Sequence, residues 1–144
     1  MVSPHVSYRM MAACSGLLVA LASGCGGGGG SGKVYAEKAT FSCLTTKQAS
    51  GGVGELSDTG DNWDYIQNDA TGGWISGKIN GNDFAMSFGK ADEEGRAIEQ
   101  SYRAIAGGFG VEDAAIVRRD NVVISWTVAP SDESKSTVED CLQE

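Results

Sequence analysis

The side chains best suited to chemistry are carboxylates interspersed with aromatic rings in the middle of the chain. They are Asp61, Asp64 and Asp69, with Trp63, Tyr65 and Trp74 close by. Two carboxylates can serve as acid and as base or nucleophile in glycoside hydrolysis, and neighbouring aromatic rings are the arrangement that a sugar site would use. The alternative is that the rings are buried in the core of a small domain and the aspartates are solvated loop residues.

The same stretch offers oxygen ligands for calcium. Asp58, Asp61 and Asp64 recur at every third residue, whereas the helix-loop-helix calcium loop uses alternate positions and a more distant Glu. Residues 51–56 resemble one copy of a glycine-rich calcium repeat, but Leu56 stands where that repeat has Asp. A calcium-dependent adhesion module is therefore an alternative rather than the main expectation.

The N-terminus has the pattern of an export signal. Arg9 precedes an apolar stretch at residues 10–22, and small residues lead from there to Cys25. A positive start, an apolar centre of about 7–15 residues and small residues at a cut site are typical of a secretory signal peptide. The stretch is too short for a membrane-spanning helix, which needs about 20 apolar residues.

The end of this signal, Ala22-Ser23-Gly24-Cys25, resembles the lipobox of bacterial lipoproteins. In that family the cysteine thiol receives a diacylglyceryl group and the chain is cut before it, so the resemblance implies that Cys25 is lipidated and becomes the first residue. The family prefers Leu three places before the cysteine, where this chain has Ala22. Ordinary secretion, with cleavage at residues 22–24 and a free Cys25, is the alternative.

The residues after Cys25 suit an anchored domain. Residues 26–32 are all glycine except Ser31, and a glycine-rich coil of this length reaches about 15 Å. Such slack lets a domain stand clear of the headgroups, and two acyl chains bind a membrane stably. We expect a signal peptide at 1–24, a lipidated cysteine and tether at 25–32, a single domain at 33–144, and an extracytoplasmic, membrane-anchored localisation.

Removal of residues 1–24 excludes several chemistries. The only histidine, His5, is lost, which excludes Ser-His-Asp and Cys-His hydrolases and histidine-ligated haem, copper or zinc. Arg9 is lost as well, so that 10 of the 11 basic side chains face 19 acidic ones and the net charge is −9. Nucleic acid needs clustered Lys and Arg, and the adjacent Arg118 and Arg119 would point to opposite faces of a strand. The sequence predicts no cofactor, no metal and no nucleic-acid partner.

Two cysteines, Cys43 and Cys141, remain in the expected domain. In an exported protein two cysteines are most simply one disulfide, because the compartment is oxidising; two free thiols are the alternative. A bridge that closes a loop of about a hundred residues stabilises a fold by about 4–5 kcal/mol in the chain-entropy model. It would join the two ends of the domain.

Two hairpins are expected to supply the sheet. Residues 74–79 and 83–88 alternate in polarity around Asn80-Gly81, and this dipeptide supplies the positive φ angles of a type I′ turn. Residues 115–118 and 122–128 form the second hairpin through residues 119–121, and the apolar segment 122–128 is expected at the centre of the sheet. A short strand at 63–67 is expected to follow a loop at 51–60.

Three helices complete the expected fold. Residues 40–49 favour a helix over a strand. The second helix is expected to have Asp92 as its cap, to include the i, i+4 pair of Glu99 and Arg103, and to stop at glycines 107 and 108. Its apolar positions follow helical spacing: Ile98, Tyr102 and Ile105. Ser131 or Asp132 caps the third helix.

Helices and hairpins in this order predict an α+β fold. The two hairpins make a mostly antiparallel sheet, and helices packed on one face of it give a two-layer domain. Residues 121–126 and 138–142 resemble the C-terminal end of small exported bacterial lipoproteins that have no assigned function. That resemblance implies the pairing of Cys43 with Cys141 at most, and no activity.

The sequence thus predicts a lipid-anchored extracytoplasmic module without catalytic activity. Its expected partners are the membrane, through the lipid on Cys25, and an envelope protein or glycan bound by the sheet face or by residues 51–73. One alternative is a carboxylate-dependent enzyme that acts on envelope glycans with residues among Asp61, Asp64 and Asp69. The other is the calcium-dependent adhesion module.

Overall fold

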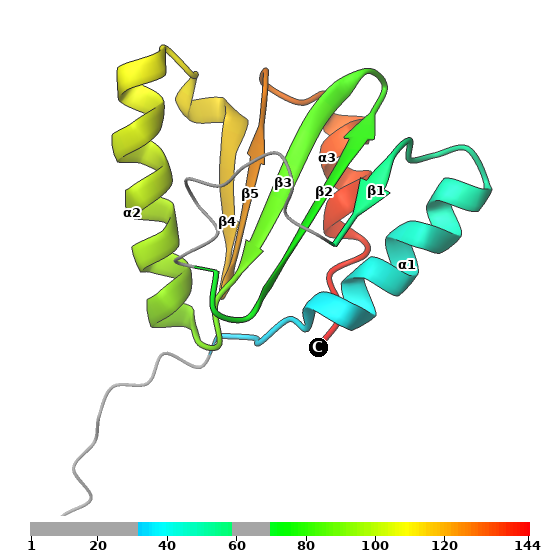
Figure 1. Ribbon diagram of the computed structural model, residues 1–144, viewed down its shortest axis with the longest axis horizontal. Helices are drawn as coiled ribbons and strands as arrows, with labels where there is room; N and C mark the ends of the chain where they lie inside the picture. Colours follow the sequence, from blue (N-terminus) through cyan, green and yellow to red (C-terminus); the bar gives the residue numbers. More distant parts are fainter. Residues whose placement is uncertain (1–31, 59–69) are drawn as a thin grey trace, which may run out of the picture.

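The computed structural model describes residues 32–58 and 70–144 of the chain. This part contains an antiparallel sheet of five strands in the order β1-β2-β3-β5-β4 (Figure 1). The strands are β1 (Leu56–Ser57), β2 (Gly73–Ile79), β3 (Asn82–Phe88), β4 (Ile116–Arg119) and β5 (Val122–Trp126). The helices are α1 (Glu37–Ala49), α2 (Asp92–Phe109) and α3 (Asp132–Glu139). The predicted α+β class is confirmed.

Both predicted hairpins are present. The turn between β2 and β3 has φ angles of 52° at Asn80 and 80° at Gly81, as a type I′ turn requires. The second turn contains two residues, Asp120 and Asn121, rather than the expected three, because Arg119 still pairs with Val122. The predicted strand at 63–67 lies outside the described residues.

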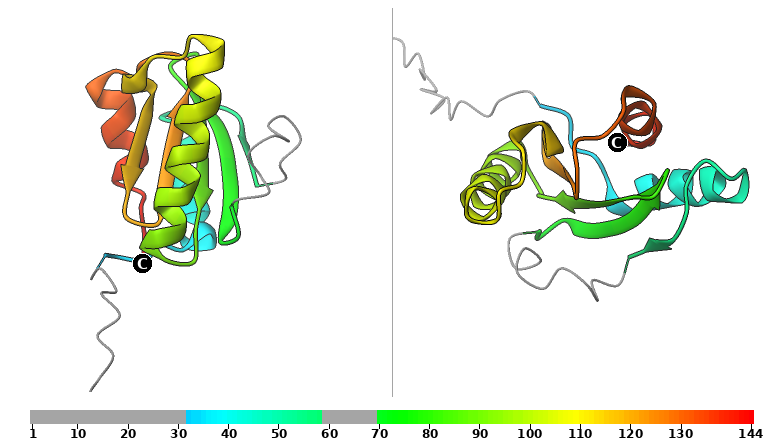
Figure 2. Two further views of the ribbon diagram at one scale, coloured as in Figure 1. Left: turned by 90° about the vertical axis from the view of Figure 1, so that its left-hand side faces the viewer. Right: turned by 90° about the horizontal axis from the view of Figure 1, so that it is seen from above.

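Helices cover both faces of the sheet rather than one face as expected. Successive residues of a strand point to opposite faces. In β5, Val122 and Ile124 pack in the cluster that contains Leu44 of α1 and Val138 of α3, whereas Val123 packs against Ile98 of α2. Figure 2 shows α2 well apart from α1 and α3. Because β5 is buried along its whole length, it needs a layer on each side, and the domain has three layers.

Both ends of α2 differ from their predicted positions. Ala91 is the N-cap and makes no side-chain cap bond, while Asp92 is the first helical residue. Glycines 107 and 108 do not stop the helix, since each costs only about 1 kcal/mol relative to alanine. The helix ends at Phe109 and is capped by Gly110, whose φ of 70° is left-handed.

The buried stripe of α2 is Ile98, Tyr102 and Ala106, whereas Ile105 is exposed. Near its start, at Gly95, the helix packs directly against the turn between β4 and β5. A Cβ atom there would lie 2.3 Å from the carbonyl oxygen of Asp120. Only glycine therefore lets α2 approach the turn between β4 and β5 this closely.

The other two helices largely follow the prediction. Helix α1 begins three residues before the expected start, and the expected loop at 51–60 contains the two-residue strand β1. Of the two candidate caps of α3, Ser131 is the one used, because its hydroxyl accepts a hydrogen bond of 3.2 Å from the Ser134 amide.

The two ends of the described chain lie together (Figure 1). Cys43 and Cys141 form a disulfide with Cα atoms 5.4 Å apart. The Ala36 amide donates to the Gln143 carbonyl at 2.7 Å. The chain therefore enters and leaves the domain at one end.

The buried side chain of Asn121 holds the entering segment against the sheet. Its Oδ1 accepts from the Tyr35 amide at 2.8 Å, and its Nδ2 donates to the carbonyls of Tyr35 at 3.0 Å and Gly89 at 2.6 Å. The Gly89 amide in turn donates to the Asn121 carbonyl at 2.7 Å. Asn121 thus joins the N-terminal segment, the end of β3 and the turn before β5.

We predict that Asn121→Ala lowers the free energy of unfolding by about 3 kcal/mol, because it removes three hydrogen bonds and leaves backbone groups without partners. Chemical denaturation with the disulfide intact measures this change. Asn82→Ala is the matched control, since Asn82 also bonds backbone groups, those of Val128, but in exposed surroundings. Equal losses for the two variants would contradict the special role of Asn121.

Candidate functional site

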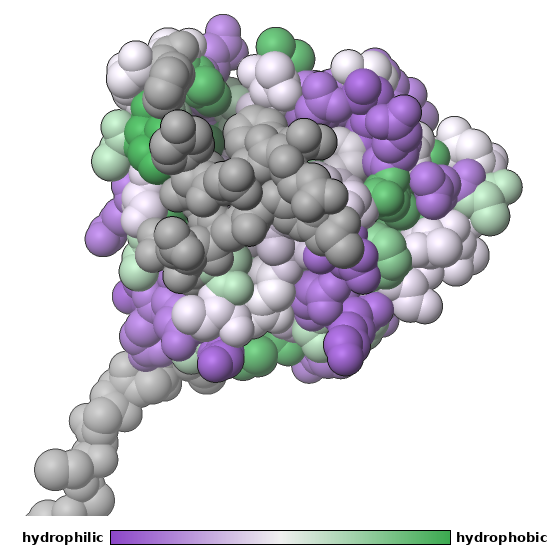
Figure 3. All heavy atoms as spheres, viewed as in Figure 1, coloured by the Kyte–Doolittle hydropathy of each residue, from purple (hydrophilic) through white to green (hydrophobic). Residues whose placement is uncertain are grey.

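A recess of about 470 Å³ lies on the sheet near the turn between β2 and β3. Its lining comes from β1 and the residue before it, and from β2 and β3. The lining residues are Glu55, Leu56, Ser57, Ser76, Gly77, Lys78, Asp83 and Phe84. Figure 3 shows hydrophilic residues over this part of the surface, whereas apolar residues gather around the C-terminal end of α2.

The polar side chains of the recess share one face of the sheet. Ser57 pairs with Ser76 across β1 and β2, and Lys78 pairs with Asp83 across β2 and β3. The strand alternation puts all four on the face opposite Phe84. The Lys78 Nζ lies 3.3 Å from the Asp83 Oδ1, with both side chains about half exposed. The Ser76 hydroxyl, the Lys78 ammonium and the Asp83 carboxylate can together donate and accept hydrogen bonds to a polar ligand.

Backbone contacts keep the recess in shape. The Lys78 amide donates to the Glu55 carbonyl at 3.0 Å, and the Gly54 amide donates to the Lys78 carbonyl at 2.6 Å. A Cβ atom on Gly77 would lie 2.7 Å from the side chains of Leu56 and Phe84. Gly77 therefore lets these two side chains close the core directly beneath the recess.

The three candidate catalytic carboxylates are not among the residues that the structure describes. Asp61, Asp64 and Asp69 lie outside the described residues, together with Trp63, Tyr65 and the lipidation site Cys25. Trp74 is only 7% exposed, so it belongs to the core and does not offer a surface for stacking on a sugar. Asp58 lies near Glu37. Burial is the main cause that raises the pKa of Glu37, and the negative charge of Asp58 raises this pKa further.

The predicted disulfide cysteines, Cys43 and Cys141, are brought together. Within residues 32–58 and 70–144, no group of three His, Cys, Asp or Glu side chains is arranged to hold a metal ion. Over the same ranges, none of the helices is both long and apolar enough to cross a membrane.

A buried polar cluster between α2 and the sheet was missed by the sequence analysis. The hydroxyls of Tyr102 and Ser87 share a hydrogen bond of 2.9 Å, and burial raises the pKa of Tyr102. The Nε1 of Trp74 and the Oγ of Ser125 are buried and have no hydrogen-bond partner among the described residues. Helical spacing identified Tyr102 only as part of an apolar stripe, because the serines that face it come from distant strands.

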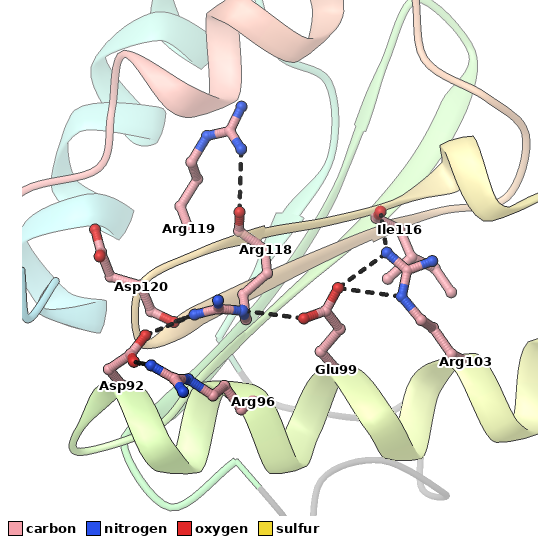
Figure 4. Close-up of polar contacts among 8 residues, drawn as sticks. All are labelled: Asp92, Arg96, Glu99, Arg103, Ile116, Arg118, Arg119 and Asp120. Atoms are coloured by element: carbon pink, nitrogen blue, oxygen red, sulfur yellow. Dashed lines mark hydrogen bonds and ion pairs between the residues drawn. The ribbon is translucent and has the colours of Figure 1, made fainter. Parts of the chain in front are cut away.

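An ion-pair network joins α2 to β4 (Figure 4). Arg118 donates from Nη1 to the Asp92 Oδ1 at 2.6 Å and from Nε to the Glu99 Oε2 at 3.0 Å. The predicted pair of Glu99 and Arg103 is present at 2.9 Å. Arg96 also binds the Asp92 carboxylate. Each guanidinium of the network is therefore neutralised by carboxylates of the same chain.

Arg119 points to the other face of the sheet, as its position next to Arg118 predicts. Its Nη2 lies 2.9 Å from the Oε1 of Glu139 in α3. The two adjacent arginines therefore connect β4 to a helix on each side. They do not form a clamp for an anion.

Comparison of this chain with protein-family models, with curated proteins and with solved structures finds no match.

The pKa of Asp92 is lowered, chiefly by the hydrogen bond from Arg96. Burial opposes this effect, and the weaker contribution of the hydrogen bond from Arg118 lowers the pKa further. A carboxyl whose pKa is lower in the folded state stabilises the fold above its unfolded pKa of about 4, and this contribution is lost as the pH falls through the folded pKa. We predict that Asp92→Asn is less stable than the wild type at neutral pH. The difference between them should shrink below about pH 4.

Urea midpoints over a pH series measure this difference. Glu112→Gln is the control, because Glu112 is an exposed carboxylate in the turn after α2 and its replacement should leave the pH profile unchanged. A stability difference between Asp92→Asn and wild type that is the same at every pH would refute the role of the ion pairs.

Proposed function

We propose that this protein is a lipid-anchored, extracytoplasmic binding module without catalytic activity. In this proposal Cys25 carries the lipid, residues 26–32 form the tether, and the recess between β1 and β3 contacts an envelope protein or glycan. The disulfide between Cys43 and Cys141 is the observation that supports export most directly, because disulfides persist in oxidising compartments.

The position of the recess supports its role as the contact surface. Asn121 holds the N-terminal segment next to Gly89, which follows the C-terminal end of β3. Asp83 of the recess lies at the N-terminal end of the same strand. A strand of seven residues spans about 23 Å. A lipid anchor that precedes Gly32 would therefore place the recess away from the bilayer. In that position an envelope component can reach the recess.

The chemistry of the recess also suits binding. Its polar groups project from strands that are paired in register and held by backbone hydrogen bonds. Rigid strands position such groups more accurately than loops do. A polar surface, such as a hydroxylated sugar or a hydrogen-bonding protein segment, is the kind of ligand these groups can recognise.

The lipid anchor is tested by metabolic labelling with a palmitate analogue. We expect label in the wild type and none in Cys25→Ala, because only this cysteine ends the lipobox. Cys14→Ala is the matched control and should keep its label, since Cys14 lies within the signal peptide. An unlabelled wild type would remove the anchor from the proposal.

The recess is tested by placing a photoreactive amino acid at Ser76 in living cells. We expect a discrete crosslinked product from this position, and none of it from the same probe at Ser136, an exposed residue of α3. The product should also be lost when Cys25→Ala prevents anchoring. Identical products from positions 76 and 136 would show that the recess is not the contact surface.

Two further measurements decide between this proposal and its alternatives. Cleavage of purified envelope glycan fragments, detected by mass spectrometry and lost in Asp61→Asn or Asp64→Asn, would favour the carboxylate-dependent enzyme. A melting temperature that falls on chelation would favour the calcium-dependent adhesion module.

A further inference from the structure

The charged side chains of the recess form one row across the sheet. Lys78 of β2 pairs with Asp83 of β3. On the other side of β2, the Lys78 amide donates to the Glu55 carbonyl at 3.0 Å, so Glu55 stands opposite Lys78. Leu56, the next residue, packs against the core. Because side chains alternate along an extended segment, Glu55 lies on the opposite face, where it lines the recess.

This row contains two carboxylates and only one ammonium. The Lys78 Nζ lies 3.3 Å from the Asp83 Oδ1. The carboxylate of Glu55 has no ion-pair or hydrogen-bond partner among the residues that the structure describes, and Glu55 is exposed. The described lining therefore has a net charge of −1. A cationic group is the ligand that complements an uncommitted carboxylate of this kind.

A hydroxyl lies beside the charged row. Ser76 is two residues before Lys78 in β2, so the two side chains share one face of the sheet. Ser76 is partly exposed, and its hydroxyl both donates and accepts hydrogen bonds. It can therefore bind a polar group that lies next to the cation on the same ligand.

The described part of the recess offers no aromatic surface to a sugar. Its one aromatic lining residue, Phe84, is 0% exposed and packs against Trp126 in the core. Trp74 is on the recess face but is buried. A sugar would lack a ring on which to stack, whereas a guanidinium or ammonium needs only carboxylates and other acceptors. These observations favour a protein partner over a glycan.

We propose that the recess binds an arginine or lysine side chain of a partner protein, with Glu55 and Asp83 as the anions and Ser76 as a neighbouring hydrogen-bonding group. Arginine suits the free carboxylate of Glu55 best, because a guanidinium can donate two parallel hydrogen bonds to it. The whole chain has 19 acidic and 11 basic side chains, so it attracts a basic partner from a distance. The inference rests on the proposed function, since it names the partner of the same recess.

The test is a titration of the full chain, purified in detergent with its disulfide intact and followed by the NMR shifts of its amides. The probe is the peptide acetyl-Gly-Arg-Gly-amide. Its citrulline counterpart replaces the guanidinium with a neutral urea of similar shape. We expect the arginine peptide to bind at least about tenfold more tightly, equivalent to about 1.4 kcal/mol. The shifts should concentrate on residues 55–57 and 76–78, and binding should weaken as salt is added.

Three variants separate the effects of the individual charges. Glu55→Gln should raise the dissociation constant of the arginine peptide about threefold, as expected for an exposed ion pair, and leave that of the citrulline peptide unchanged. Lys78→Gln should lower the dissociation constant of the arginine peptide, because it removes the competing ammonium from Asp83. Glu133→Gln is the control: it removes one charge from an exposed residue of α3 and should bind like the wild type.

Three outcomes would overturn the inference: equal affinities for the two peptides, a Glu55→Gln variant that binds the arginine peptide as tightly as the wild type, or a Lys78→Gln variant that binds it more weakly. Recess shifts with an N-acetylglucosamine oligomer but not with the arginine peptide would assign the recess to glycans instead. The titration depends neither on anchoring nor on the native partner. Its failure is therefore distinct from failure of the crosslinking at Ser76, which tests contact with any partner.

Discussion

The carboxamide of Asn121 is the interaction on which the arrangement of this domain depends. It lies in a two-residue turn, where it binds both backbone groups of Tyr35 and the carbonyl of Gly89. These contacts fix the entering chain relative to β3 and β5. The same turn approaches α2 at Gly95 so closely that no larger residue would fit. The Asn121 side chain therefore sets the position of the N-terminal segment. It does so from the same turn that packs against α2.

Much of the fold could be predicted from local signals. Asn80-Gly81 specified the first hairpin, and Ser131 specified the start of α3, because each acts on its own backbone. Local signals could not predict which face of the sheet each helix covers. Ile105 fits the helical spacing as well as Ala106, but Ala106 is the one that packs in the cluster with Ile116 of β4 and Val123 of β5. The recess escaped prediction for the same reason, since β1 is recognisable only by its pairing with β2.

The two arginines of β4 connect this short edge strand to the helices on both faces of the sheet. Arg118 binds α2 on one face, and Arg119 binds α3 on the other. Removing either residue would loosen one helix and leave the other attached, because the two sets of carboxylates are separate. The sheet is thus joined to each helix by a charged contact in addition to apolar packing. Arg119 also donates a hydrogen bond to the Arg118 carbonyl of the same strand.

The meeting of the two ends of the domain has a practical consequence. Lys33 and Glu144 form an ion pair at 2.5 Å, so the part of the chain that forms the domain begins and ends at the same side of the sheet. A reporter protein fused after Glu144 would start there, a full strand length from Asp83. Such a fusion would stand away from the recess, whereas an insertion between Asn80 and Gly81 would stand close to Lys78 and Asp83, which pair two residues before the turn.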